Sequence, residues 1–184
     1  HAAKVKNNLQ LKRDSDLSKS LSKLITKKIL SNEIIKSFAL PKKIHGTIFS
    51  KSKKGMKYGQ HIDNPYMSSG RADLSFTIFL SNKKDYKGGC LSIESFNSEE
   101  KFKLNAGEII IYPSTYLHSV EEVIDGERLV FIGWIESYVK SIEEREYLFD
   151  LDAAARSLLA KYGRSEEVDL IFKSYSNLLK RLGS

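Results

Sequence analysis

Residues 72–80 read ADLSFTIFL, and this stretch indicates the fold class of the chain. Its apolar residues recur at every second position, as Leu74, Phe76, Ile78 and Leu80. Side chains alternate between the two faces of an extended strand, so a period of two predicts a half-buried β-strand here. The segments on either side continue this β pattern.

Short strand-like segments recur along the central part of the chain. They cover residues 44–49, 90–93, 101–104, 108–112, 117–123 and 129–135. Residues 51–57 read as a polar loop and residues 82–89 as a turn, and Asn105-Ala106-Gly107 and Asp125-Gly126 favour tight turns. Many short strands at intervals of roughly 8–12 residues predict a sandwich or a barrel.

Helical patterns precede and follow this β region. Apolar residues recur at intervals of three and four over residues 15–29, with Ser15 or Asp16 able to cap the start. Helical patterns return over residues 142–162, ending near Gly163, and over residues 165–182. We therefore expect residues 1–139 to form a β core with an N-terminal helix, and residues 140–184 a C-terminal helical extension.

The last predicted helix carries a stripe of large apolar side chains. Its members are Val168, Ile171, Phe172, Tyr175, Leu178, Leu179 and Leu182. A solvated helix face does not carry such a stripe, so it covers either the core of the domain or a partner subunit in a homodimer. Packing on the core is the default interpretation.

A candidate metal site lies in the segment Tyr58-Gly59-Gln60-His61-Ile62-Asp63. An extended chain directs His61 and Asp63 to the same side. A second imidazole, His118, follows Asp63 by 55 residues in another strand-like run. Two histidines and one carboxylate are the ligand set of non-haem Fe(II) oxygenases. The pattern alone leaves an alternative open, a histidine that lies near a surface aspartate.

Arg128 follows His118 by ten residues. A guanidinium group can hold a carboxylate through two parallel hydrogen bonds. A metal triad together with such a carboxylate clamp is what an enzyme that uses Fe(II) and 2-oxoglutarate needs. A metal-binding protein of the cupin type without oxygenase activity is the competing interpretation.

Composition narrows the class of protein. The single cysteine, Cys90, excludes an intrachain disulfide framework and suits a reducing compartment, so we expect a cytoplasmic location. No apolar run has the length of a membrane span, and no membrane partner is expected.

Charge is distributed unevenly along the chain. Residues 1–57 hold 15 Lys and Arg against 3 Asp and Glu, whereas residues 58–184 hold 15 against 20. Such a basic region can bind a polyanion, and a polyanion-binding module is a further alternative. Few aromatic residues lie between these lysines to stack on bases, so a solvated surface is favoured over a nucleic-acid site.

The chain resembles the PKHD-type hydroxylase family, a bacterial branch of the prolyl-4-hydroxylase-like 2-oxoglutarate and Fe(II) dioxygenases. The resemblance runs almost from end to end. Its segments are VKNNLQL (5–11), GQHIDN (59–64), RADLS (71–75), FLS (79–81), DYKGG (85–89), YPS (112–114), LH (117–118), WIES (134–137), LFDLD (148–152) and YSNLL (175–179).

The resemblance implies a function and a set of site residues. In that family His61, Asp63 and His118 would bind iron, and Arg128 would bind the distal carboxylate of 2-oxoglutarate. The enzyme would use O₂ to hydroxylate a C–H bond of a small-molecule or peptide substrate, prolyl or related, releasing succinate and CO₂. Ascorbate would be the reductant that restores over-oxidised iron.

Two features depart from the family pattern. Ser52 stands where members carry a tyrosine a few residues before the HxD motif, and Tyr58 is the candidate to supply that hydroxyl instead. Members also begin with a further segment of a few dozen residues, so this sequence is expected to be part of a longer chain.

Geometry tests the assignment of Arg128. If Asp125-Gly126 closed a flat hairpin, Arg128 would lie opposite Val123, roughly 17 Å along the strand from His118 at about 3.3 Å per residue. One five-carbon diacid cannot span that distance. The assignment of Arg128 therefore requires the chain to cross between two facing sheets after His118. The double-stranded β-helix, or jelly roll, that the resemblance implies does this.

Overall fold

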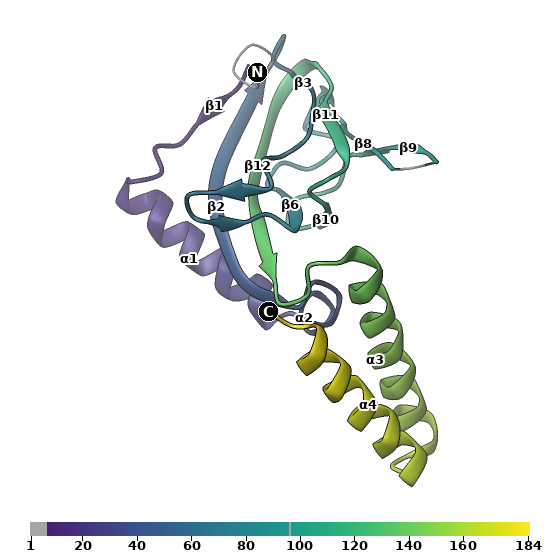
Figure 1. Cartoon of the computed structure of the whole chain (residues 1–184). Coiled ribbons are helices and arrows are strands. Elements are labelled where there is room, and N and C mark those ends of the chain that lie inside the picture. The colour runs from purple at the N-terminus through teal and green to yellow at the C-terminus, as the bar shows by residue number, and fades with distance from the viewer. Residues whose placement is uncertain (1–6, 96) are drawn as a thin grey trace. The chain divides into compact units, whose positions relative to one another are not determined.

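The computed structural model describes residues 7–95 and 97–184 (Figure 1). Its strands are β1 (Leu9–Gln10), β2 (Pro41–Lys53), β3 (Tyr58–His61), β4 (Tyr66–Met67), β5 (Gly70–Arg71), β6 (Leu74–Phe79), β7 (Tyr86–Gly88), β8 (Leu91–Glu94), β9 (Glu99–Phe102), β10 (Ile109–Pro113), β11 (Leu117–Val120) and β12 (Val123–Ser137). Its helices are α1 (Asp16–Ser31), α2 (Glu33–Ala39), α3 (Ile142–Tyr162) and α4 (Glu166–Leu182). The expected fold class, mainly β with an N-terminal helix and a C-terminal helical pair, is confirmed.

Two antiparallel sheets form the β core. The larger sheet has the order β1-β2-β12-β6-β10, with β7 also paired to β12. The smaller sheet has the order β3-β11-β8-β9, and β4 and β5 form a separate hairpin. Figure 1 shows the two longest strands, β2 and β12, running side by side through the larger sheet.

Strand β6 forms where the alternating pattern predicts it, but it is not half-buried. All six of its residues are buried, including Ser75 and Thr77. The apolar face packs Phe76 against Phe131, while Ser75 and Thr77 line an internal cavity. Phe76 also lines the cavity, so the alternation separates apolar from hydroxyl side chains within a buried strand, not a packed face from solvent.

The chain crosses between the two sheets directly after His118. Strand β11 belongs to the smaller sheet and β12 to the larger one, with only residues 121 and 122 between them. This crossing satisfies the geometric requirement that the sequence imposed on Arg128. The turn expected at Asp125-Gly126 is wrong, because both residues lie within β12. Gly126 has φ +77° beside an irregularity in the β7–β12 register, which is typical of a β-bulge.

By packing, the chain divides into two compact units. Of the described residues, one unit holds 7–25 and 44–136, and the other holds 26–43 and 137–184. The division into a core of residues 1–139 and a C-terminal helical extension of residues 140–184 stays a prediction.

The second unit contains α2, α3 and α4. Ser141 and Ser165 cap the starts of α3 and α4 through hydrogen bonds to Glu144 N and Val168 N. Three residues of the predicted stripe on α4 pack on a buried cluster, namely Tyr175, Leu179 and Leu182 against Leu40, Val139 and Leu148. Part of the stripe therefore covers the unit's own core, whereas Leu178 stays exposed.

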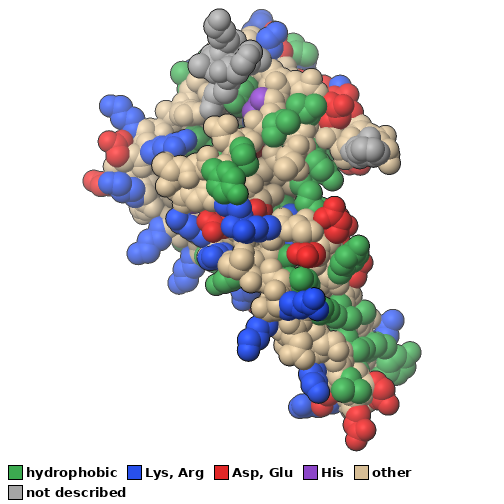
Figure 2. All heavy atoms as spheres, viewed as in Figure 1, with side chains coloured by type: hydrophobic (Ala, Val, Ile, Leu, Met, Phe, Trp, Pro, Cys, Tyr) green, Lys and Arg blue, Asp and Glu red, His purple; other side chains and the backbone are tan. Residues whose placement is uncertain are grey.

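Helix α1 is basic, with four lysines and one aspartate. Lys19, Lys23, Lys27 and Lys28 are all exposed, and Figure 2 shows Lys and Arg side chains gathered over this helix. Its predicted apolar face is only partly covered, since Leu17 and Leu24 are exposed while Ile29 is buried. Among the helices of the described residues, none is both long enough and apolar enough to cross a membrane.

Candidate metal centre

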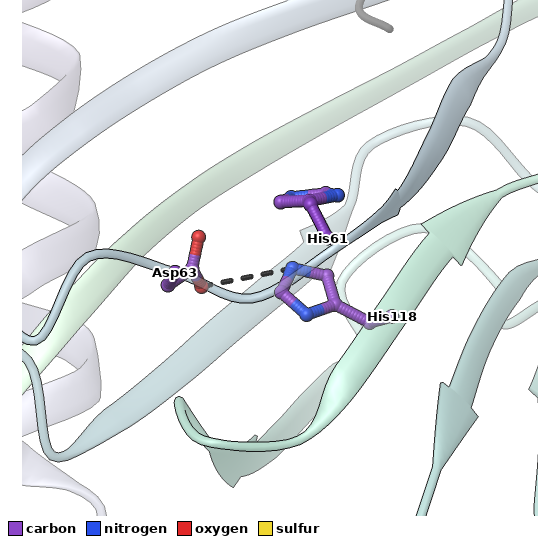
Figure 3. A group of neighbouring side chains, drawn as sticks. All are labelled: His61, Asp63 and His118. Carbon is purple, nitrogen blue, oxygen red and sulfur yellow. Dashed lines mark ion pairs between the residues drawn. The ribbon is translucent and has the colours of Figure 1, made fainter. Parts of the chain in front are cut away.

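The three predicted ligands meet because two strands pair in one register. Strand β3 pairs with β11 so that His61 lies directly opposite His118. Paired residues of an antiparallel ladder project from the same face, and the two imidazole centroids are 4.2 Å apart. Asp63 follows two residues after β3, and its Oδ2 lies 3.6 Å from His118 Nε2 (Figure 3). One ligand atom from each residue falls within 4.8 Å of the others.

Each imidazole has one nitrogen held by the backbone. Nδ1 of His61 lies 2.8 Å from the carbonyl oxygen of Gly59, and Nδ1 of His118 lies 3.0 Å from that of Tyr116. A carbonyl oxygen only accepts, so Nδ1 carries a proton in both rings. The neutral ring with this proton is the tautomer in which a histidine binds a metal ion through Nε2.

Two tyrosines support the imidazoles. The ring of Tyr58 stacks on His61 at 3.7 Å, and the ring of Tyr112 meets His118 edge-on at 5.2 Å. Burial raises the pKa of Tyr112 far above its usual range. Burial and the Asp63 carboxylate raise the pKa of Tyr58. Both phenols therefore stay protonated at neutral pH and can donate hydrogen bonds.

Arg128 is a buried cation at this site. Its side chain is 4% exposed, and its guanidinium carbon lies 5.5 Å from the ring centroid of Phe79. Burial lowers the pKa of Arg128, and the neighbouring Tyr86 opposes that shift. Within the described residues, Nε of Arg128 has no hydrogen-bond partner and no carboxylate pairs with the group. A buried charge without a partner is costly, so this position favours an anionic ligand.

A cavity of about 100 Å³ connects these groups. Its walls come from both sheets and include all four predicted site residues, His61, Asp63, His118 and Arg128. The rest of the wall is neutral: Asn7, Asn8, Ser50, Ser52, Tyr58, Ser75, Phe76, Thr77, Leu91, Tyr112, Val120, Val130, Ile132, Gly133 and Trp134. Nε1 of Trp134 is a second buried donor without a partner among the described residues.

The His61-Ile62-Asp63 motif did not predict several of the residues that line the cavity. Ser75, Thr77, Tyr112 and Trp134 face the cavity, and none was expected from the sequence. Two hydroxyl residues at alternate positions of an otherwise apolar strand were the available sign for Ser75 and Thr77. Arg71 and Asp73 do not line the cavity, and they form an ion pair of 2.8 Å with each other.

Comparison with known proteins agrees with this geometry. Residues 47–136 match the family model of the 2OG-Fe(II) oxygenase superfamily. A PKHD-type hydroxylase of Prochlorococcus marinus strain MIT 9215 is 75% identical over 183 residues, which cover all of this chain and 83% of the relative. A PKHD-type hydroxylase of strain MIT 9211 is 60% identical over the same shares of the two chains.

Solved structures share the fold at low sequence identity. A prolyl-4-hydroxylase of Pseudomonas putida is 16% identical with a TM-score of 0.54, covering 73% of this chain and 74% of that one. A 2OG-Fe(II) oxygenase family oxidoreductase of Burkholderia pseudomallei is 16% identical with a TM-score of 0.51, covering 70% and 63%. These two likenesses support the jelly-roll fold alone. The full-length identity to the Prochlorococcus proteins goes further, and the chain belongs to the PKHD-type hydroxylases of the 2OG-Fe(II) oxygenase superfamily.

Proposed function

We propose that His61, Asp63 and His118 bind Fe(II) and that Arg128 binds the distal carboxylate of 2-oxoglutarate in this hydroxylase. The observation that carries the proposal is the donor set itself: one imidazole nitrogen from each histidine and one carboxylate oxygen lie within 4.8 Å of one another. They line a cavity that also contains a buried arginine whose Nε has no hydrogen-bond partner among the described residues. Two imidazoles and a carboxylate suit Fe(II) and leave coordination positions open.

The residues around the site orient the two imidazoles and the cosubstrate. Backbone carbonyls hold both imidazoles in the Nδ1–H form, and the neutral phenols of Tyr58 and Tyr112 pack against them. Fe(II) with 2-oxoglutarate and O₂ supplies, when bound, the oxidising chemistry by which a C–H bond becomes C–OH and the cosubstrate leaves as succinate and CO₂. The buried guanidinium of Arg128 sets the direction of the cosubstrate by pairing with one of its ends.

The charge of the cavity wall indicates which kind of substrate can enter. Apart from the four site residues, every described residue that lines it is uncharged. A free amino acid carries an ammonium and a carboxylate, and beyond the four site residues neither has a charged partner among the described residues of this wall. We therefore propose that an uncharged segment enters the cavity, as a prolyl or related residue within a peptide would present. Trp134 Nε1 is available as a donor to a carbonyl of such a segment.

Further features of the proposal extend beyond the site. Ascorbate is the proposed reductant, the cytoplasm is the proposed location, and a homodimer through the C-terminal helices is the proposed assembly. The competing cupin-type metal protein has no use for 2-oxoglutarate, so strict dependence of turnover on this cosubstrate separates the two functions.

The test measures succinate release against a panel of prolyl peptides, free amino acids and small metabolites. We expect turnover that requires both Fe(II) and 2-oxoglutarate and that is highest with a peptide. The Asp63→Ala variant should lose turnover while keeping its circular dichroism spectrum, because one of three ligands is missing. Asp150→Ala, which removes an exposed carboxylate on α3, is the matched control. A fully active Asp63→Ala enzyme would overturn the ligand assignment.

A further inference from the structure

We propose that Ser75 is a positioning residue that orients Asp63 for metal binding, an inference that rests on the proposed function of Asp63 as a ligand. The Ser75 hydroxyl donates a hydrogen bond of 2.6 Å to Asp63 Oδ2. Within the described part of the chain no other hydrogen-bond donor contacts this carboxylate. Ser75 itself is only 3% exposed, so water does not compete readily for the bond.

The two residues differ in how firmly the backbone holds them. Ser75 lies in β6, where it is the register partner of Tyr112 on β10 and of Trp134 on β12. Neighbouring strands therefore fix its main chain from both sides. Asp63 lies outside any strand, two residues after β3 ends. No sheet ladder sets the direction of its side chain, and the hydroxyl from the fixed strand can do so.

All three proposed ligands are oriented by a hydrogen bond, but the partner of Asp63 differs in kind from the partners of the histidines. Each has one atom held by the protein: Nδ1 of His61 by the Gly59 carbonyl, Nδ1 of His118 by the Tyr116 carbonyl, and Oδ2 of Asp63 by Ser75. Backbone carbonyls orient the two histidines, whereas a side chain orients the aspartate. The support of Asp63 is therefore the one that a point substitution removes.

The size of the expected effect follows from the nature of the contact. A hydrogen bond to an ionised carboxylate is roughly twice as strong as one between neutral groups. Without it the carboxylate rotates among several orientations, and metal binding has to select one of them. Loss of such an outer partner typically weakens metal affinity about 10- to 100-fold.

The chain offers a matched control for this substitution. Ser92 on β8 is also buried and also donates a hydrogen bond to a carboxylate, that of Glu99 on β9. Neither Ser92 nor Glu99 lines the cavity. Ser92→Ala therefore removes the same kind of contact from the same fold at a distance from the proposed ligands.

The experiment titrates the metal-free protein with Co(II), following the visible absorption of the bound ion and, in parallel, the thermal midpoint of the metal-free form. We expect Ser75→Ala to weaken Co(II) binding at least about 10-fold and to change the absorption bands. Ser75→Thr, which keeps the hydroxyl, should bind as the unmodified chain does, and so should Ser92→Ala. If Ser75→Ala does not fold, Ser75→Gly replaces it, since it also lacks the hydroxyl and has the same expected direction.

The outcomes distinguish a failure of the proposed role of Ser75 from a failure of the proposed metal site. If the unmodified chain binds Co(II) and Ser75→Ala binds it equally well with the same spectrum, the positioning role of Ser75 is wrong and the ligand assignment stands. An equal loss of affinity in Ser75→Ala and Ser92→Ala also contradicts the role, because it indicates a general loss of stability. If the unmodified chain does not bind Co(II), the proposed metal site fails, and the role of Ser75 fails with it.

Discussion

Arg128 shows how burial at a single residue points to a ligand. Its guanidinium group is enclosed by Phe79, Tyr86 and the cavity, with no carboxylate of the described residues to compensate its charge. Replacing it by alanine removes the proposed partner of a buried carboxylate, and truncation of such pairs costs about 2–5 kcal/mol.

We therefore expect Arg128→Ala to weaken 2-oxoglutarate binding by about 30-fold or more while Co(II) affinity changes little. Isothermal titration of the Co(II)-loaded protein with 2-oxoglutarate measures the first quantity, and titration with Co(II) alone measures the second. Arg164→Ala, at an exposed arginine beside Asp169, is the control. Unchanged 2-oxoglutarate affinity in Arg128→Ala would mean that another cation holds the carboxylate.

Tyr58 separates the contribution of a ring from that of a hydroxyl. Its ring stacks on His61 at an interplanar angle of 22°. Aromatic stacking is worth about 0.5–1.5 kcal/mol, so Tyr58→Leu should weaken Co(II) binding by about 2- to 12-fold. Tyr58→Phe keeps the ring and should bind Co(II) like the unmodified chain.

Tyr58→Phe also tests whether the Tyr58 hydroxyl binds 2-oxoglutarate in place of the family tyrosine, at whose position this chain has Ser52. If it does, Tyr58→Phe raises the KM for 2-oxoglutarate although metal affinity is unchanged. An unchanged KM for 2-oxoglutarate in Tyr58→Phe would exclude that role for the hydroxyl.

At the scale of elements, the start of β12 determines where Arg128 lies. Gly126 has φ +77°, and a Cβ at this position would lie 2.4 Å from the carbonyl oxygen of Asp85 and 2.8 Å from Tyr86 Cα. These are backbone atoms of the β7 region, which cannot move aside without breaking the β7–β12 pairing. A side chain here is therefore both strained and obstructed.

Gly126→Ala should consequently destabilise the protein more than Gly107→Ala does. Gly107 also has positive φ, +90°, but a Cβ there meets nothing within 4 Å. Left-handed backbone costs about 1–2 kcal/mol at either position, and the obstruction adds about 1–3 kcal/mol at Gly126 alone. Denaturant unfolding measures both, and equal losses would contradict the proposed close packing of β7 on β12. We also expect weaker 2-oxoglutarate binding in Gly126→Ala, because Arg128 lies two residues further along the strand.

At the scale of the whole molecule, α4 contributes to the core of the unit formed by residues 26–43 and 137–184. Leu179→Ala removes packing against the cluster of Leu40, Val139 and Leu148. We expect a loss of about 2 kcal/mol, the lower end for leucine truncation, since Leu179 is partly buried. Leu170→Ala, at a residue 59% exposed on the same helix, should cost almost nothing. Equal losses would show that α4 does not pack as described.

In the proposed homodimer, exposed residues of α4 would form the interface between the two subunits. A charge at exposed Leu178 should dissociate a dimer without unfolding the chain, whereas deletion of residues 165–184 should expose the cluster and cause aggregation. Sedimentation velocity measures both. A monomer at high concentration in the unmodified chain would assign the stripe to the chain's own core.

Local patterns by themselves determined much of this protein. The period of two over residues 72–80 and the period of 3.6 over residues 142–182 are consequences of backbone geometry, and the structure confirms a strand and two helices there. The spacing of His61, Asp63 and His118 likewise predicted a candidate metal site, and the structure brings these three side chains together. The hypothesis that Arg128 binds the cosubstrate also required the chain to cross between sheets after His118, and strands β11 and β12 do lie in different sheets.

Only the tertiary structure decided which side chains support those groups. Asp125-Gly126 resembles a hairpin turn locally, yet pairing with β7 keeps both residues within β12. Ser75 and Thr77 look like the solvent face of a strand, yet the second sheet closes over them and makes them cavity wall. The contact between Ser75 and Asp63 depends on where a segment outside any strand meets strand β6 of the larger sheet. Periodicity carries no information on such a contact, because the path of a segment outside the sheets does not follow from a repeating pattern.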